Sequence, residues 1–185
     1  MSDFPEIILN LDVIMKDNPC VLANPNIAKI VQDALLYFEG ERYYLIAWCI
    51  MPDHVHVLFA PKGGYTVSTI LHSWKSYTAN KINKILKRDG PFWSQESFDH
   101  VVRSVENLYG LKLYIEDNPV KAGLCSRDED WAFSSSGNKF NPSSEYEFID
   151  PRKTPFVHPQ FRKLPHLYKE NATYFVTFTT YFIKQ

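Results

Sequence analysis

The chain has 185 residues, of which 45% are hydrophobic and 15% aromatic, so it can bury the core of one domain and is not a disordered tail. Its net charge of −1 and isoelectric point near 6.6 argue against a protein that coats duplex DNA through many phosphate contacts, although they leave room for a local basic groove. Three widely spaced cysteines, Cys20, Cys49 and Cys125, form no CxxC pair and indicate neither a disulfide framework nor a structural zinc site.

The N-terminal half predicts a helix followed by a β-hairpin. Acidic residues within and after a short apolar run at the N-terminus do not suit a signal peptide, and no apolar run reaches the length of a membrane span, so we expect a cytoplasmic protein without a membrane partner. Between Asn26 and Phe38 apolar residues recur at helical spacing. Residues 43–50 and 54–59 are rich in β-branched and aromatic residues, and the short link between them favours an antiparallel pair.

The next segment predicts a long helix, a third strand and a further helix. The long helix extends from about Thr66 to Lys87, and residues 98–103 alternate loosely as a strand. Ser104 can cap the last helix, which ends near Asn118 because a proline follows. Residues 126–165 contain five prolines and many serines, a composition typical of an irregular linker.

This order of elements lacks one strand of a ferredoxin-like βαββαβ sheet, and the missing first strand is a central one. Residues 172–182 have the required composition, with β-branched and aromatic side chains and no glycine or proline. We therefore predict an α+β fold: a ferredoxin-like antiparallel sheet with helices on one face, whose central first strand comes from the C-terminal segment. The domains would be a core at 1–125, a linker at 126–165 and a strand-bearing segment at 166–185.

Two short motifs carry residues suited to chemistry. His54 and His56 alternate on a strand, so both imidazoles share one face and can bind one cation. An HxH pair also occurs often by chance. Tyr114 and Asn118 are one helical turn apart on one face of the last helix, although such a phenol is usually a partly buried surface residue and an asparagine before proline is usually a helix stop.

Four stretches in this order resemble the REP-associated branch of the single-tyrosine HUH transposases: Met51–Phe59, Ile70–Thr78, Gly90–Trp93 and Tyr114–Leu124. The resemblance covers roughly residues 20 to 135. It implies a nickase and strand transferase that cleaves and rejoins single-stranded DNA, with a hairpin beside the target, through a 5′-phosphotyrosine intermediate.

The resemblance also implies roles for individual residues. His54 and His56 match the metal ligands of the family, Asn118 matches its polar third ligand, and Tyr114 matches its nucleophile. The expected cofactor is Mg²⁺ or Mn²⁺, a divalent cation that can polarise a scissile phosphate.

Other residues are weaker candidates for DNA contacts. Lys75 and Lys121 could reach phosphates, although an exposed lysine is as often merely solvated. Phe92 and Trp93, expected on a loop near the site, could stack on bases. Asp53 either orients a histidine or makes the turn before it.

The C-terminus departs from the family pattern. Arg162–His166 and Ala172–Phe178 resemble the segment with which members usually begin, so the chain resembles a circularly permuted member. The strand could return to its own molecule or enter a partner, which would give a homodimer by strand exchange. Two other functions are open at this stage: a catalytically inactive single-stranded or hairpin DNA-binding protein of transposase descent, and a metal-bound phosphodiesterase that uses water.

Overall fold

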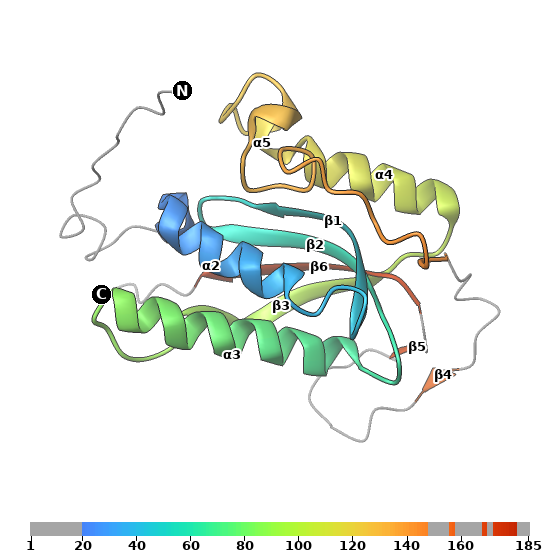
Figure 1. Ribbon diagram of the computed structural model, residues 1–185, viewed down its shortest axis with the longest axis horizontal. Helices are drawn as coiled ribbons and strands as arrows, with labels where there is room; N and C mark the ends of the chain where they lie inside the picture. The colour runs from blue at the N-terminus through green and yellow to red at the C-terminus, as the bar shows by residue number, and fades with distance from the viewer. Residues whose placement is uncertain (1–19, 148–155, 158–167, 170–171, 181–185) are drawn as a thin grey trace.

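The computed structural model describes residues 20–147, 156–157, 168–169 and 172–180. Its elements, in chain order, are η1 (Val21–Ala23), α2 (Pro25–Leu36), β1 (Tyr43–Ile50), β2 (His54–Pro61), α3 (Val67–Ile85), β3 (Trp93–Val101), α4 (Val105–Glu116), α5 (Asn118–Lys121), η2 (Asp128–Asp130), β4 (Phe156–Val157), β5 (Tyr168–Lys169) and β6 (Tyr174–Thr180) (Figure 1). The segment Arg162–His166, which resembles the family's usual beginning, lies outside the described residues.

The main sheet has the strand order β1-β2-β6-β3, with β6 antiparallel to both of its neighbours. Val57 pairs with Val176 on one side of β6, and Asp99 pairs with Val176 on the other. The prediction of an antiparallel sheet whose central strand comes from the C-terminal segment is confirmed. In this structure β6 and the histidine strand β2 belong to the same chain.

Local sequence explains where the two long helices of this unit begin. Asn24 caps α2 by accepting a hydrogen bond from the backbone of Asn26, and a proline occupies the first turn, where its missing N–H costs nothing. Thr66 and Thr69 form a reciprocal capping box at the start of α3. The boundaries predicted for the long helix agree with α3 to within about two residues.

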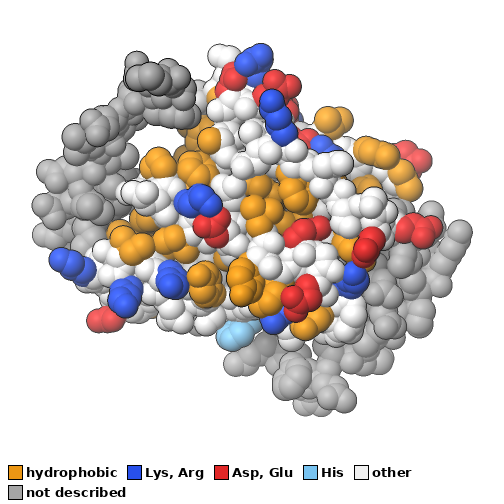
Figure 2. Space-filling view, viewed as in Figure 1, with side chains coloured by type: hydrophobic (Ala, Val, Ile, Leu, Met, Phe, Trp, Pro, Cys, Tyr) orange, Lys and Arg blue, Asp and Glu red, His pale blue; other side chains and the backbone are white. Residues whose placement is uncertain are grey.

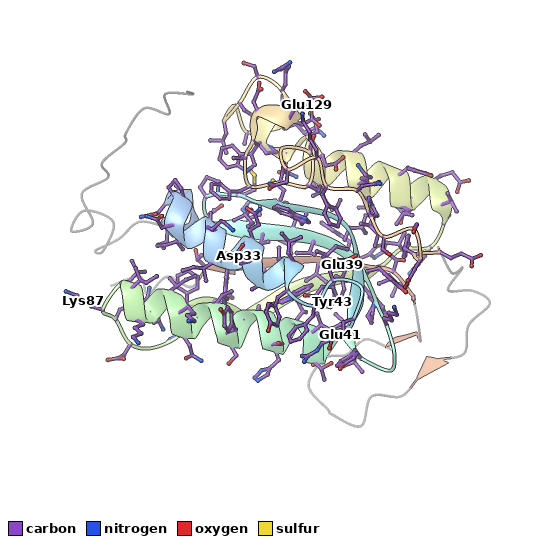
Figure 3. The ribbon with its side chains drawn as sticks, in the orientation of Figure 1. Asp33, Glu39, Glu41, Tyr43, Lys87 and Glu129 are labelled. Carbon is purple, nitrogen blue, oxygen red and sulfur yellow. The ribbon has the colours of Figure 1, made fainter. Side chains whose placement is uncertain are left out.

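α2 and α3 cover one face of the sheet, as predicted for the ferredoxin-like unit (Figure 1). The buried hydroxyl of Tyr43 on β1 donates to the backbone carbonyl of Leu35 on α2 (2.9 Å) and accepts from Trp74 Nε1 on α3 (3.0 Å), so one side chain ties both helices to the sheet (Figure 3). Burial raises the pKa of Tyr43 to about 12, so this phenol stays protonated. Figure 2 shows acidic and basic side chains interspersed with hydrophobic ones over this side of the molecule.

α4 lies on the opposite face of the sheet, outside the ferredoxin-like unit (Figure 1). Leu108 and Ile115 of α4 join a second core cluster with Cys49, Leu58 and Phe175 of the sheet. Cys49 is therefore a buried core residue. Among the described residues, no helix combines the length and hydropathy that crossing a membrane requires.

Part of the predicted linker is packed against the sheet. The backbone N–H of Ile50 donates to the carbonyl of Phe133 (2.8 Å), and the N–H of Ser135 donates to the carbonyl of Trp48 (2.8 Å). This segment therefore hydrogen-bonds to β1, the first strand of the sheet, along the edge that β2 does not occupy. Covering an edge in this way satisfies backbone groups that another chain could otherwise pair with.

Candidate active site

His54 and His56 lie side by side on β2, on the face of the sheet that α4 covers. Their Nε2 atoms are 3.1 Å apart and their ring centroids 4.7 Å apart. The other nitrogen of each ring has its own partner: Nδ1 of His54 is 2.6 Å from Asp53 Oδ1, and Nδ1 of His56 is 2.8 Å from Thr177 Oγ1. Asp53 thus occupies the orienting position that the sequence suggested.

These partners indicate which tautomers the histidines adopt. A carboxylate only accepts hydrogen bonds at neutral pH, so Nδ1 of His54 carries a proton, and in the neutral form of this imidazole Nε2 carries a lone pair. If His56 likewise donates from Nδ1 to the Thr177 hydroxyl, both lone pairs point at the same place. Two converging lone pairs repel each other until a cation lies between them, so the donor arrangement fits a metal ion.

His56 is well suited to remain neutral. It is 6% exposed, and burial followed by the charge of His54 lowers the pKa of His56 to about 4. A neutral imidazole is the form that binds a metal. Among the described residues no three histidine, cysteine, aspartate or glutamate side chains form a metal-sized cluster, so a third ligand drawn from these residues would be of another kind, such as an amide.

Tyr114 projects from α4 towards this pair. Its ring centroid is 5.7 Å from that of His56 and 6.2 Å from that of Phe175, and the side chain is 43% exposed. The phenol is thus partly packed against the histidine strand and partly exposed to solvent. Tyr114 and His56 therefore lie side by side in the structure.

Asn118 and Lys121 follow Tyr114 within about two helical turns and are the first and last residues of α5. Asn118 Nδ2 donates to the backbone carbonyl of Tyr114 (3.2 Å), which leaves its side-chain oxygen as a candidate ligand. Lys121 Nζ is 5.4 Å from the centroid of the Tyr114 ring and 3.0 Å from Asp117 Oδ2. Lys121 therefore places a positive charge beside the phenol of Tyr114.

Three of the predicted DNA contacts do not fit the structure. β3 begins at Trp93, earlier than the predicted start at residue 98, so Trp93 is on a strand and Phe92 directly precedes it. They are 1% and 5% exposed in the core on the α2–α3 side, where Trp93 Nε1 donates to Thr78 Oγ1 (2.8 Å), and buried rings offer no face to a base. Lys75 is half-buried on α3, on the other side of the sheet from the histidines, and its Nζ donates to the carbonyl of Ser94 (3.0 Å).

Sequence reasoning missed the two β6 residues that complete this site, Phe175 and Thr177. Phe175 stacks on His56 with ring centroids 5.6 Å apart, and Thr177 is the partner of His56 Nδ1. Both alternate on the face of β6 that the histidines share, because His56 pairs with Thr177 across the sheet. The composition of β6 indicated a strand, but only its register identifies these two side chains.

A family model described as "Transposase IS200 like" matches residues 22–118, more than half of the chain and a range that contains both histidines, Tyr114 and Asn118. The chain belongs to this family. β6 lies outside the matched range, although it is central in the sheet.

Individual relatives agree with this membership. A Haemophilus influenzae protein of the REP-associated tyrosine transposase type is 27% identical over 107 residues, which cover 52% of this chain and 61% of the relative. The REP-associated tyrosine transposase of Escherichia coli K12 is 26% identical over 109 residues, covering 58% of this chain and 63% of the relative. The chain thus matches about three fifths of the length of these curated relatives.

A solved structure shares the fold. It is described as a REP-associated tyrosine transposase bound to a REP hairpin, and it superimposes with a TM-score of 0.55 at 21% sequence identity. The match covers 64% of this chain and 69% of the solved one. At this level of identity the likeness concerns the arrangement of the sheet and helices.

Proposed function

We propose that this protein cleaves and rejoins single-stranded DNA through a covalent bond to Tyr114, as a metal-dependent tyrosine transposase. One observation carries the proposal: the partly exposed phenol of Tyr114 packs beside His56, whose Nε2 converges with that of His54. Membership of the IS200-like transposase family supports the reading, because the matched range contains all of these residues.

In the proposed reaction the oxygen of Tyr114 forms a bond to a backbone phosphorus while the bond from that phosphorus to the 3′ oxygen breaks. The phenol loses its proton, the departing 3′ oxygen gains one, and a 5′-phosphotyrosine remains. One phosphodiester is exchanged for another, so a free 3′-OH can attack in reverse and join strands. An unperturbed phenol has a pKa of about 10, so it needs help to attack at neutral pH. Lys121, beside the ring, can stabilise negative charge that develops there.

His54, His56 and Asn118 would hold the metal, and the ion when bound would supply positive charge to the scissile phosphate. Asp53 and Thr177 keep the two histidines in the required tautomers and orientations. Of the two cations expected, Mn²⁺ accepts imidazole ligands more readily than Mg²⁺, which prefers oxygen ligands, so the two histidines favour Mn²⁺ for binding assays.

We further propose that the substrate includes a DNA hairpin and that the chain is circularly permuted. The solved structure of similar fold holds a REP hairpin, which supports a hairpin substrate here. A central β6 that follows the matched range by more than fifty residues supports the permutation. Strand exchange between two copies is a variant of this arrangement in which β6 would enter a partner's sheet.

The test is covalent capture of DNA. Purified protein with Mn²⁺ is incubated with labelled single-stranded oligonucleotides that carry hairpins of the host genome and is run on a denaturing gel. We expect a labelled protein band that chelation and Tyr114→Phe abolish, whereas Tyr109→Phe, which alters an exposed tyrosine of the same helix, retains it. Binding without an adduct would favour an inactive DNA-binding protein, and cleavage without an adduct would favour a water-dependent phosphodiesterase.

A further inference from the structure

Glu116, two residues beyond Tyr114, is a buried carboxylate that the proposed chemistry does not use. It is 7% exposed, although a buried charge is costly unless it is paired. Both of its oxygens have partners: Oε2 is 2.6 Å from Lys112 Nζ on the same helix, and Oε1 accepts from Ser135 Oγ at 2.9 Å. The second contact joins α4 to a segment that follows it in the chain.

Ser135 is itself fixed to the sheet. Its backbone N–H donates to the carbonyl of Trp48 (2.8 Å), and its Oγ accepts from the N–H of Trp48 (3.2 Å). A hydroxyl has one proton, and the contact with Glu116 is shorter than the alternative one with the carbonyl of Trp48 (3.2 Å). The hydroxyl therefore links β1 to α4 through one charge-assisted hydrogen bond.

The Glu116–Ser135 contact lies on the flank of α4 opposite to Tyr114. Ile115 is fully buried against the sheet, and neighbouring residues of a helix are about 100° apart, so Tyr114 and Glu116 flank Ile115 on opposite sides of the helix. Glu116 is held at β1, while Tyr114 reaches His56 on β2 and Phe175 on β6. Holding one flank of α4 thus sets where the other flank points.

We infer that the Glu116–Ser135 contact positions the nucleophile by fixing the rotation of α4 over the sheet. The inference rests on the proposed function, and both residues act through Tyr114 without touching substrate. With the phenolic oxygen on the order of 8 Å from the helix axis, a rotation of about 10° displaces it by roughly 1.4 Å. A misplacement of about 1 Å can lower a reaction rate by about 100-fold.

The experiment compares Ser135→Ala, Glu116→Ala and the double variant with wild type and with Ser136→Ala. Ser136 is the matched control because its hydroxyl donates to Asp128 (2.6 Å) on the same segment. Each variant is first shown to be folded by thermal unfolding. We expect kcat for adduct formation to fall by about 10- to 100-fold in Ser135→Ala and Glu116→Ala, with KM for the oligonucleotide unchanged and no further loss in the double variant. Glu116→Gln, which keeps an acceptor for Ser135, should restore most of the rate.

A second readout needs no DNA and separates this inference from the proposed function. The protein is labelled with 3-fluorotyrosine, and the ¹⁹F resonance of Tyr114 is assigned by its loss in Tyr114→Phe. That resonance should shift or broaden in Ser135→Ala and stay in place in Ser136→Ala. Wild type that forms no adduct would refute the proposed function alone. An unchanged Tyr114 resonance in Ser135→Ala, or a change in KM without a change in kcat, would overturn the positioning role.

Discussion

Replacing Phe178 with alanine tests the central placement of β6. Phe178 is 1% exposed and packs edge-to-face on Trp93 with ring centroids 4.8 Å apart, so its removal leaves a cavity in the core on the α2–α3 side. Truncation of a buried phenylalanine typically costs about 3–5 kcal/mol, which is a large part of the roughly 5–15 kcal/mol that stabilises a domain. With an m-value of about 2 kcal/mol per molar of urea, the unfolding midpoint should fall by about 2 M.

The assay is urea unfolding followed by tryptophan fluorescence. Thr179→Ala is the matched control, because Thr179 is the next residue of β6 and is exposed; its effect should stay below about 1 kcal/mol. Since β6 belongs to the same chain as β2, the midpoint should not depend on protein concentration. A Phe178→Ala protein that unfolds like wild type would refute the packing argument, and a concentration-dependent midpoint would indicate strand exchange.

Three further predictions follow from the same structure. A chain that ends before Arg162 lacks β6, so it should lose cooperative unfolding; a soluble, monomeric and cooperatively folded product in size-exclusion and melting experiments would contradict this. Calorimetry should show Mn²⁺ binding that His54→Ala abolishes and that Asp53→Asn weakens by about 10- to 100-fold, and equal affinity in the three proteins would disprove the assignment of ligands. In the presence of a chelator, the contribution of His56 to stability should fall as the pH drops from about 6.5 towards 4 and change little below. Between these pH values His56 binds a proton in the unfolded chain but not in the folded one, because burial lowers the pKa of His56 to about 4. The difference destabilises the folded protein by up to about 3 kcal/mol. His56→Gln should therefore make stability less dependent on pH in this range.

Much of the fold could be predicted from the sequence because several signals agreed. Helical spacing located α3, and a short link between two β-rich runs located the β1–β2 hairpin. The position of β6 required a topological argument, since a sheet cannot lack its central strand. The pairing of β2 with β6 confirms that argument.

The parts of the site that sequence reasoning missed depend on packing across the sheet. Phe92 and Trp93 have the composition of a stacking surface, but only their packing in the core on the α2–α3 side shows that they are buried. Thr177 could be found only from the register of β6 against the histidine strand. Ser135 lies in a segment whose serines and prolines indicated an irregular linker, and nothing in that composition predicts a hydrogen bond to Glu116.

The most direct test of the proposed chemistry is to locate the covalent bond. After reaction with an oligonucleotide, the adduct is digested with a protease and a nuclease, and the modified peptide is sequenced by tandem mass spectrometry. We predict a nucleotide joined through its 5′ phosphate to Tyr114, together with a released strand that ends in a 3′-OH. A modification on Tyr109 or another residue, or a phosphate retained on the released 3′ end, would contradict the account.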